Sequence, residues 1–209
     1  MLHHYLVAVS MAFIAMFPII NPVGHAPMFY AMTMGDSPGF RRRQALKTSI
    51  YVFLILFVSL VLGNNILRFF SITIDDLRIA GGLLVAHSAW NMLNNTSRVT
   101  PAEDVAAMDK DDISLTPMAT PILAGPGAMS LALGLLSYGR SWIQYGGYIT
   151  GCFLIALLTW VCLRYADSLV KVISVNAMGA INRVLGFLIL AIGVDLMVRG
   201  VKDIFFPNV

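Results

Sequence analysis

The sequence predicts an all-α, polytopic membrane protein with six transmembrane helices, arranged as two inverted three-helix repeats in which helices 1 and 4 are broken. Three observations favour this fold class: an apolar composition, six apolar segments and a weak internal repeat. Hydrophobic residues make up 58% of the 209 residues and charged residues only 12%, whereas ordinary soluble domains carry about 25% charged residues. Lipid must therefore cover much of the surface.

Six apolar segments approach the length of about 20 residues that crosses a bilayer. Their expected ranges are residues 5–34, 48–70, 77–93, 115–138, 145–165 and 180–206. The first segment could be mistaken for a signal peptide. Because no Lys or Arg precedes it and no small-residue cleavage site follows Ile20, we interpret it as a span that stays.

A polar connection covers about residues 95–114 of a single transmembrane domain, residues 1–209. It separates repeat 1, about residues 1–94, from repeat 2, about residues 115–209. Basic residues gather in the odd-numbered connections and at their edges: Arg41, Arg42, Arg43, Lys47, Arg98, Lys110, Arg164, Lys171 and Arg183. Because cytoplasmic loops are enriched in Lys and Arg, we expect a cytoplasmic (inner) membrane protein with residues 95–114 in the cytoplasm and both termini outside.

Comparison of the chain with itself gives three matches in the same order. Residues 18–24 resemble 121–127, residues 66–72 resemble 169–175, and residues 78–81 resemble 183–186, at shifts of 103 to 105. Each match alone is weak, since apolar segments look alike by chance, but three at nearly one shift indicate a repeat. Each half has three spans, so the second half enters the membrane from the opposite side, as is typical of secondary transporters.

Proline and glycine interrupt the first and fourth spans at matching positions. The residues are Pro18, Asn21, Pro22, Gly24 and Pro27 in the first, and Pro117, Thr120, Pro121, Gly125, Pro126 and Gly127 in the fourth. Proline removes a backbone donor, and freed backbone groups need protein or a water-filled cavity to satisfy them. Paired breaks in inverted halves indicate a substrate site. The alternative is packing kinks or re-entrant turns without a ligand, which a single broken span would favour.

The broken helices offer groups of both polarities. A restarting helix exposes unpaired N–H groups that can hold a carboxylate, and the preceding half-helix exposes carbonyl oxygens that can hold an ammonium group. Gly24, Gly125 and Gly127 would let a ligand approach the backbone, and Asn21 and Thr120 could add neutral hydrogen bonds. Such a site suits a small zwitterion.

The segments 21–27 (NPVGHAP) and 120–127 (TPILAGPG) resemble the signature segments of the MarC family, a bacterial and archaeal membrane family also described as the neutral amino acid transporter (NAAT) family. The resemblance covers nearly the whole chain. It implies a protein of the cytoplasmic membrane, with some members moving small neutral amino acids such as glycine and alanine, coupled to protons. The binding positions that it implies are Asn21, Pro22, Gly24, Pro27, Pro121, Gly125, Pro126 and Gly127; it implies no role for His25.

Isolated polar residues within the spans have two interpretations each. Asp195 could carry a coupling proton, or form an i,i+4 ion pair with Arg199, which we favour. His87 could belong to a proton relay, or be a hydrogen-bonded interior histidine, which we favour. Met28 and Met32, one turn apart, could bind copper, but methionines at this spacing usually pack. We expect no metal, no cofactor and no catalytic residue.

The sequence favours a transporter of small neutral solutes working by alternating access, with the lipid bilayer, a neutral amino acid and H⁺ as its partners and no nucleic acid. A membrane enzyme is a different class, but the chain lacks the His-Glu-x-x-His and Gly-x-Ser-x-Gly motifs. A channel, or a non-transporting scaffold or regulatory protein, is the third class. A channel would require a continuous polar path, which these spans do not provide.

Overall fold

A computed structural model of the chain describes residues 1–94, 112–135, 141–173 and 175–205. Every regular element in these ranges is a helix. The elements are α1 (Leu2–Ile20), α2 (Pro22–Met32), α3 (Pro38–Phe69), α4 (Ile74–Leu93), the π-helical η1 (Ser114–Leu123), α6 (Pro126–Gly134), α7 (Trp142–Arg164), α8 (Ala166–Val172) and α9 (Val175–Phe205).

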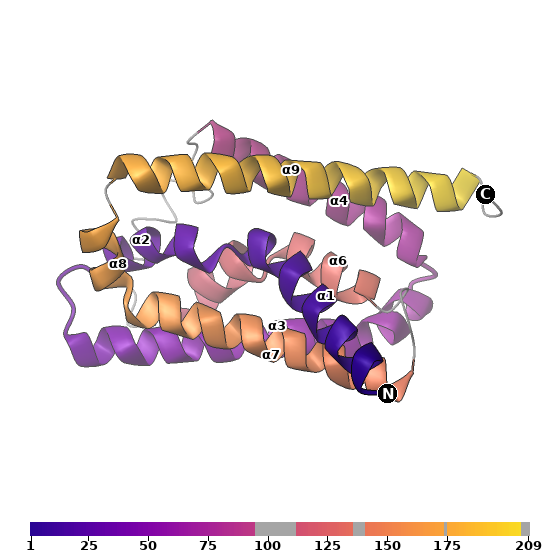
Figure 1. The fold of residues 1–209 in the computed structure, drawn as a ribbon, viewed down its shortest axis with the longest axis horizontal. Helices are drawn as coiled ribbons and strands as arrows, with labels where there is room; N and C mark the ends of the chain where they lie inside the picture. The colour runs from indigo at the N-terminus through magenta and orange to yellow at the C-terminus, as the bar shows by residue number, and fades with distance from the viewer. Residues whose placement is uncertain (95–111, 136–140, 174, 206–209) are drawn as a thin grey trace.

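The helices form one elongated bundle along which the chain runs back and forth (Figure 1). α1 and α2 run in one direction, α3 returns, and α4 runs in the first direction again. The alternation continues in the second half: η1 and α6 run in the direction of α3, α7 runs in the direction of α1, and α9 returns. α1 therefore begins and α9 ends at the same end of the bundle. The short helix α8 lies at the opposite end, beside α2.

Four helical stretches in the described part of the chain are long and apolar enough to cross a membrane: Leu2–Ile20, Pro38–Gly63, Trp142–Arg164 and Gly179–Phe205. This result supports a multi-pass membrane protein. The fourth expected span is divided between η1 and α6, which have only 10 and 9 residues. α4 has 20 residues, but Asp75, Asp76, Arg78 and Asn91 lower its hydropathy.

Small residues bring α1 and α7 close together in parallel. A Cβ on Gly147 would lie 2.6 Å from Cβ of Ala8, and a Cβ on Gly151 would lie 2.5 Å from Cβ of Ala12. The hydroxyls of Tyr5 and Thr150 form a 2.8 Å hydrogen bond across the same interface. Close approach of this kind lets van der Waals contacts hold two membrane helices together without a hydrophobic driving force.

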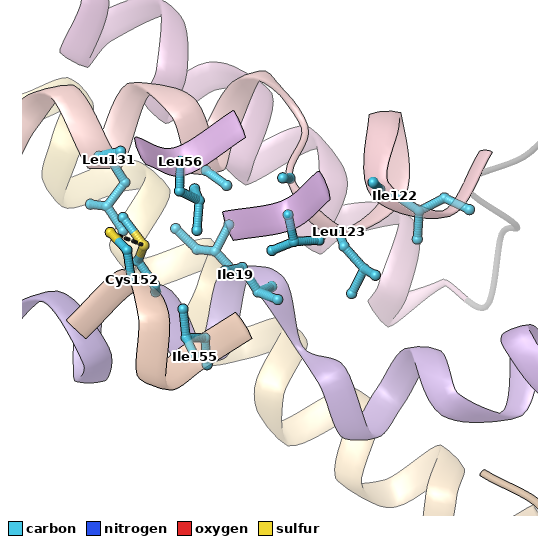
Figure 2. Close-up of a cluster of buried hydrophobic side chains, with 14 of the residues drawn as sticks. Ile19, Leu56, Ile122, Leu123, Leu131, Cys152 and Ile155 are labelled. Carbon is cyan, nitrogen blue, oxygen red and sulfur yellow. Dashed lines mark hydrogen bonds between the residues drawn. The ribbon is translucent and has the colours of Figure 1, made fainter. Parts of the chain in front are cut away.

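The core lies between α1, α3, α7 and the η1–α6 segment. Its fully buried side chains include Met16, Leu56, Ile122 and Ile155. Figure 2 shows part of this cluster, with Ile19 between Leu56 and Ile155. Cys152 and Cys162 are both free and buried; ten residues along one helix separate them by about 15 Å, too far for a disulfide. The Cys152 thiol points to the sulfur of Met16 at 3.9 Å, so it acts as an apolar packing group.

η1 and α6 lie parallel to α3. Lys47 of α3 forms an ion pair with Asp112, just before η1, and a Cβ on Gly63 would meet the side chain of Leu133 in α6. The first contact joins the N-terminal parts of the two segments, and the second joins their C-terminal parts. The η1–α6 segment therefore runs alongside α3 and in the same direction through the bundle.

α4 and α9 form a tight antiparallel pair. A Cβ on Gly82 would lie 2.6 Å from the carbonyl oxygen of Gly193, and a Cβ on Gly193 would lie 2.7 Å from the amide nitrogen of Ala86. Arg78 also donates to Asp203 at 2.6 Å. Backbone meets backbone along this interface, so any side chain at these glycines would force the two helices apart.

The Lys47–Asp112 contact predicts a measurable pH dependence of stability. Partial burial raises the pKa of the Asp112 carboxyl, but hydrogen bonds from Lys47 and Ser114, together with the charge of Lys47, outweigh burial and lower the pKa from 3.8 to about 2. A group whose pKa is lowered by folding stabilises the fold above its unfolded pKa, and that contribution disappears as the pH falls through the folded value. Both side chains are partly exposed, so we expect about 1 kcal/mol or less.

The measurement is thermal unfolding in detergent of the wild type and of Asp112→Asn between pH 2 and pH 6. We expect the wild type to be more stable by a constant margin above about pH 4, and the margin to vanish near pH 2. A margin that stays the same at every pH would contradict the assignment of the effect to Asp112.

Candidate functional site

The first break lies at Asn21, between α1 and α2. Asn21 adopts a left-handed conformation (φ 43°, ψ 58°), and its side-chain oxygen accepts a hydrogen bond from the N–H of Gly24 at 3.0 Å. Asparagine tolerates this conformation better than most residues. Pro22 follows at the first position of α2, where its missing N–H costs nothing. The Asn-Pro pair thus ends one helix and starts the next.

The His25 side chain binds the carbonyl of Ile20, which loses its helical partner at this break. In a continuous helix the N–H of Gly24 would bind the carbonyl of Ile20, but here it binds the Asn21 side chain. Nδ1 of His25 lies 3.0 Å from the carbonyl oxygens of both Ile20 and Asn21. A carbonyl only accepts, so Nδ1 carries a proton and donates. His25 is buried. In the sequence, its place directly after Asn-Pro-x-Gly is the feature that could have indicated that its ring binds backbone carbonyls at the break.

The second break extends through η1 to the start of α6. Thr116 and Thr120 are extended (φ −128° and −131°) inside η1, and each precedes a proline that forms a cis peptide bond. A residue before proline is disfavoured in the helical region, so the two Thr-Pro steps interrupt the helix twice. α6 then begins at Pro126 with Gly125 as an N-cap that provides no side-chain hydrogen bond. The first turn of α6 therefore has no side-chain cap.

A cavity of about 230 Å³ lies against the second break. Its walls come from the break, from α4 and from the end of α1; the lining residues are Ile19, Leu84, Val85, His87, Ser88, Asn91, Pro121, Ile122, Leu123, Gly125, Pro126, Gly127 and Ala128. No Asp, Glu, Lys or Arg is among these described residues. The cavity therefore has a neutral lining with one polar wall and one irregular-backbone wall.

The cavity brings together some of the predicted site residues and not others. Pro121, Gly125, Pro126, Gly127 and His87 line it. The predicted residues outside its lining are Asn21, Pro22, Gly24, Pro27, Thr120 and Asp195. The first break reaches the cavity through Ile19, two residues before Asn21, and both helices that flank this break contact η1. Ile19 and Leu123 lie next to each other in Figure 2.

The glycines of the two breaks are surrounded by protein groups. A Cβ on Gly24 would lie 2.2 Å from Nδ2 of Asn21 and 2.3 Å from Oδ1 of Asn182, and a Cβ on Gly127 would lie 2.6 Å from Cγ2 of Val85. A Cβ on Gly125 would lie 2.5 Å from the carbonyl oxygen of Pro121. Close packing by itself is therefore a sufficient reason for glycine at these positions. A ligand that approaches Gly125 or Gly127 from the cavity would be a second reason.

The polar wall of the cavity comes from one face of α4. Nε2 of His87 accepts a 3.3 Å hydrogen bond from the side-chain amide of Asn91, one turn later. Ser88 lies beside them. The histidine is thus hydrogen-bonded, as the favoured interpretation predicts, but its ring is exposed at the cavity wall rather than enclosed in the protein interior. Sequence analysis did not single out Ser88, because a lone serine within a span carries no signal.

The other isolated residues lie outside the cavity lining. Asp195 accepts a 2.8 Å hydrogen bond from Arg199 in an exposed ion pair, the partner that the i,i+4 spacing predicts. Met32 is buried and Met28 packs against the core. Within the part of the chain that the structure describes, no three His, Cys, Asp or Glu side chains come together as a metal site would require.

Comparison with known proteins identifies relatives along nearly the full length of the chain. The family profile described as "MarC family integral membrane protein" matches residues 6–205. The UPF0056 membrane protein YhcE of Escherichia coli (strain K12) is 35% identical over 92% of this chain and 91% of its own length. The UPF0056 membrane protein YvbG of Bacillus subtilis (strain 168) is 32% identical over 92% and 93%, respectively.

A more distant relative carries a location in its name. The UPF0056 inner membrane protein MarC of Escherichia coli O1:K1 / APEC is 28% identical over 94% of this chain and 95% of its own length. None of these names states a substrate or an enzymatic activity. No solved structure matches the chain.

Proposed function

The chain belongs to the MarC family of integral membrane proteins, and on that premise we propose that it transports small neutral solutes, namely neutral amino acids such as glycine or alanine. Transport would proceed by alternating access around the two broken helices and would be coupled to protons. The observation that carries this proposal is the small uncharged cavity at the second break.

The lining of the cavity matches the two ends of a zwitterion. The N–H groups of Gly127 and Ala128, in the uncapped first turn of α6, can receive a carboxylate. The Ser88 hydroxyl and the Asn91 carbonyl on the facing α4 wall can accept hydrogen bonds from an ammonium group. A volume of about 230 Å³ accommodates a small amino acid, and a neutral lining disfavours solutes with net charge.

Proton coupling would involve His87. Among the described residues of the cavity lining, it is the side chain whose ring nitrogens can take up and release a proton. Asp195 lies outside the lining and is paired with Arg199. We therefore assign the coupling role to His87 and not to Asp195.

We propose six membrane crossings, in which α4 and the η1–α6 segment complete the four apolar helices. Equivalent contacts in the two halves support an inverted repeat. Thr150 bonds Tyr5, and Lys47 bonds Asp112. At the predicted shift of 103, Thr150 corresponds to Lys47 (150 − 103 = 47), and Asp112 corresponds to residue 9 (112 − 103 = 9), one turn from Tyr5.

The α4–α9 pair supports the same symmetry. Gly82 contacts both Gly193 and Met197, and Gly193 contacts both Gly82 and Ala86, so the numbers of facing residues add to about 277. His87 then lies opposite residue 190 (277 − 87 = 190), within one turn of residue 192, its own counterpart at the predicted shift of 105. A pseudo-two-fold axis would therefore pass beside His87, at the edge of the cavity.

We also propose that both termini lie outside and that residues 95–114 lie in the cytoplasm. The Arg41–Arg43 triplet precedes the spanning part of α3, and Arg164 ends α7. Both lie at the end of the bundle opposite to the start of α1 (Figure 1). The positive-inside rule assigns that end to the cytoplasm.

Uptake by proteoliposomes tests the proposed activity. We expect saturable uptake of labelled glycine and alanine, increased by an inward proton gradient and inhibited by excess unlabelled alanine but not by tryptophan or glutamate. Tryptophan has the bulkiest side chain of the neutral amino acids, and glutamate carries a net charge. Liposomes without protein give the background.

A folded preparation that takes up neither glycine nor alanine above background would contradict the transport proposal and favour the scaffold or regulatory class. Uptake that tryptophan inhibits as strongly as alanine would instead contradict the assignment of the small cavity as the binding site.

A further inference from the structure

An apolar groove follows the outer surface of the bundle between α3 and α7, away from the cavity. Its walls are Leu46, Ser49, Ile50, Phe53, Phe153, Ala156, Leu157 and Trp160, and it has a volume of about 270 Å³. The hydroxyl of Ser49 is bonded to the carbonyl of Ala45, so it does not make the groove polar. Both helices are long and apolar enough to cross a membrane, so the groove faces lipid acyl chains.

The groove has a closed end and an open end. Phe53 and Phe153 meet edge to face, with ring centroids 5.8 Å apart, and they lie at one end. Leu46 and Trp160 lie about 10 Å along the helices, seven residues away at 1.5 Å per residue. The lengthwise dimension and the apolar walls match a segment of an extended acyl chain.

Arginines stand at the open end. α3 and α7 are antiparallel, and the residue numbers that face each other add to about 206, as for Phe53 with Phe153 and, within one, for Leu60 with Tyr145. Arg42 therefore faces Arg164, one helical turn beyond the groove on each side. Arg43 lies next to Arg42. The guanidinium of Arg164 rests over the rings of Trp160 and Tyr165, at 5.1 and 5.8 Å from their centroids, which holds it at the end of the groove.

These arginines lack a counter-charge within the described residues. Arg42, Arg43 and Arg164 form no ion pair there. Two carboxylates at this end are paired with lysines, Asp112 with Lys47 and Asp167 with Lys171. Asp36, in the turn before α3, forms no ion pair with these arginines. Guanidinium groups facing each other at the edge of a membrane repel unless an anion lies between them. Arginine binds phosphate with two parallel hydrogen bonds, which lysine cannot do.

We propose that the groove between α3 and α7 is a binding site for an anionic phospholipid. One acyl chain fills the groove between the Phe53–Phe153 contact and Leu46, and the phosphate lies between Arg42 and Arg164, with Arg43 beside it. Basic pockets between transmembrane helices at headgroup depth select such lipids. A lipid with a net negative charge is favoured over phosphatidylcholine, whose quaternary ammonium group would add a fourth cation to the cluster.

Native mass spectrometry of the full chain in detergent tests the site, with phosphatidylglycerol and phosphatidylcholine of identical acyl chains as probes. We expect the wild type to retain phosphatidylglycerol more tightly. We expect the double variant Arg42→Gln/Arg164→Gln to bind phosphatidylglycerol about tenfold more weakly, as the loss of charged hydrogen bonds implies. Glycerol phosphate, which has the headgroup charge without an acyl chain, should not compete.

The matched control is Arg68→Gln/Lys202→Gln, which removes the same charge from exposed residues at the opposite end of the bundle. It should bind phosphatidylglycerol as the wild type does. Arg42 is exposed, so Arg42→Gln alone provides a variant whose folding is not at risk, and it should bind more weakly than the wild type. Equal retention of the two lipids, equal losses in both double variants, or competition by glycerol phosphate would each overturn the proposal.

Discussion

Gly127→Val is expected to reduce uptake of glycine or alanine by about 100-fold or more, the loss that blocking a substrate-positioning group can cause. The added side chain would stand at the first turn of α6, where the proposed site receives the substrate carboxylate. It would also collide with Val85, because a Cβ at position 127 would already lie 2.6 Å from Cγ2 of that residue. Overpacking of this kind typically costs about 1–3 kcal/mol.

A second substitution separates the two effects. Val85→Ala removes the methyl groups that the new side chain meets, so the double variant Gly127→Val/Val85→Ala should recover most of the stability. We expect uptake to remain lost, because the side chain still covers the backbone N–H groups. The measurements are thermal unfolding and proteoliposome uptake on the same preparations.

Gly146→Val is the matched control for this experiment. A Cβ at position 146 would meet only Cε2 of Tyr5, at an ordinary 3.8 Å, and the residue lies outside both breaks. Its uptake should equal that of the wild type. If the double variant regained uptake together with stability, Gly127 would serve packing alone, and the proposed contact between substrate and backbone would be wrong.

Gly193→Val is expected to lower the free energy of unfolding by about 3 kcal/mol, the upper part of the range for overpacked interfaces. A Cβ at this position would lie 2.7 Å from the Ala86 amide nitrogen and 2.8 Å from the Gly82 carbonyl oxygen. Both are backbone atoms of α4, so no rotamer change can make room, and the α4–α9 pair must separate. α4 also forms the polar wall of the cavity, so uptake should fall with stability.

Gly179→Val in the same helix is the control. It makes the same change in helix propensity, but no atom lies within 4 Å of the Cβ it adds. Thermal unfolding in detergent, with the folded fraction measured by size-exclusion chromatography, compares the two variants. Equal stability of the two variants would show that the close contact between α4 and α9 does not hold the fold together.

Local chemistry explains why the sequence was sufficient for some features. An apolar composition with few charges predicts a membrane protein, and four membrane-length helices support this class. The Asn21-Pro22 and Thr120-Pro121 steps predict breaks because proline lacks an N–H and restricts its predecessor, and the structure ends or distorts helices at both. The Asp195–Arg199 pair follows from the i,i+4 spacing on one helix. Each of these features depends on residues within one helical turn.

Only the tertiary structure decided which distant segments meet. It joined the second break with the His87–Asn91 face of α4 around one cavity, and it placed Asn182 and Val85 against Gly24 and Gly127. It also placed the His25 ring against the Ile20 and Asn21 carbonyls at the first break. In a membrane, lipid-facing and protein-facing surfaces are both apolar, so periodicity does not distinguish them, and helix pairing depends on close packing that only three-dimensional contacts reveal.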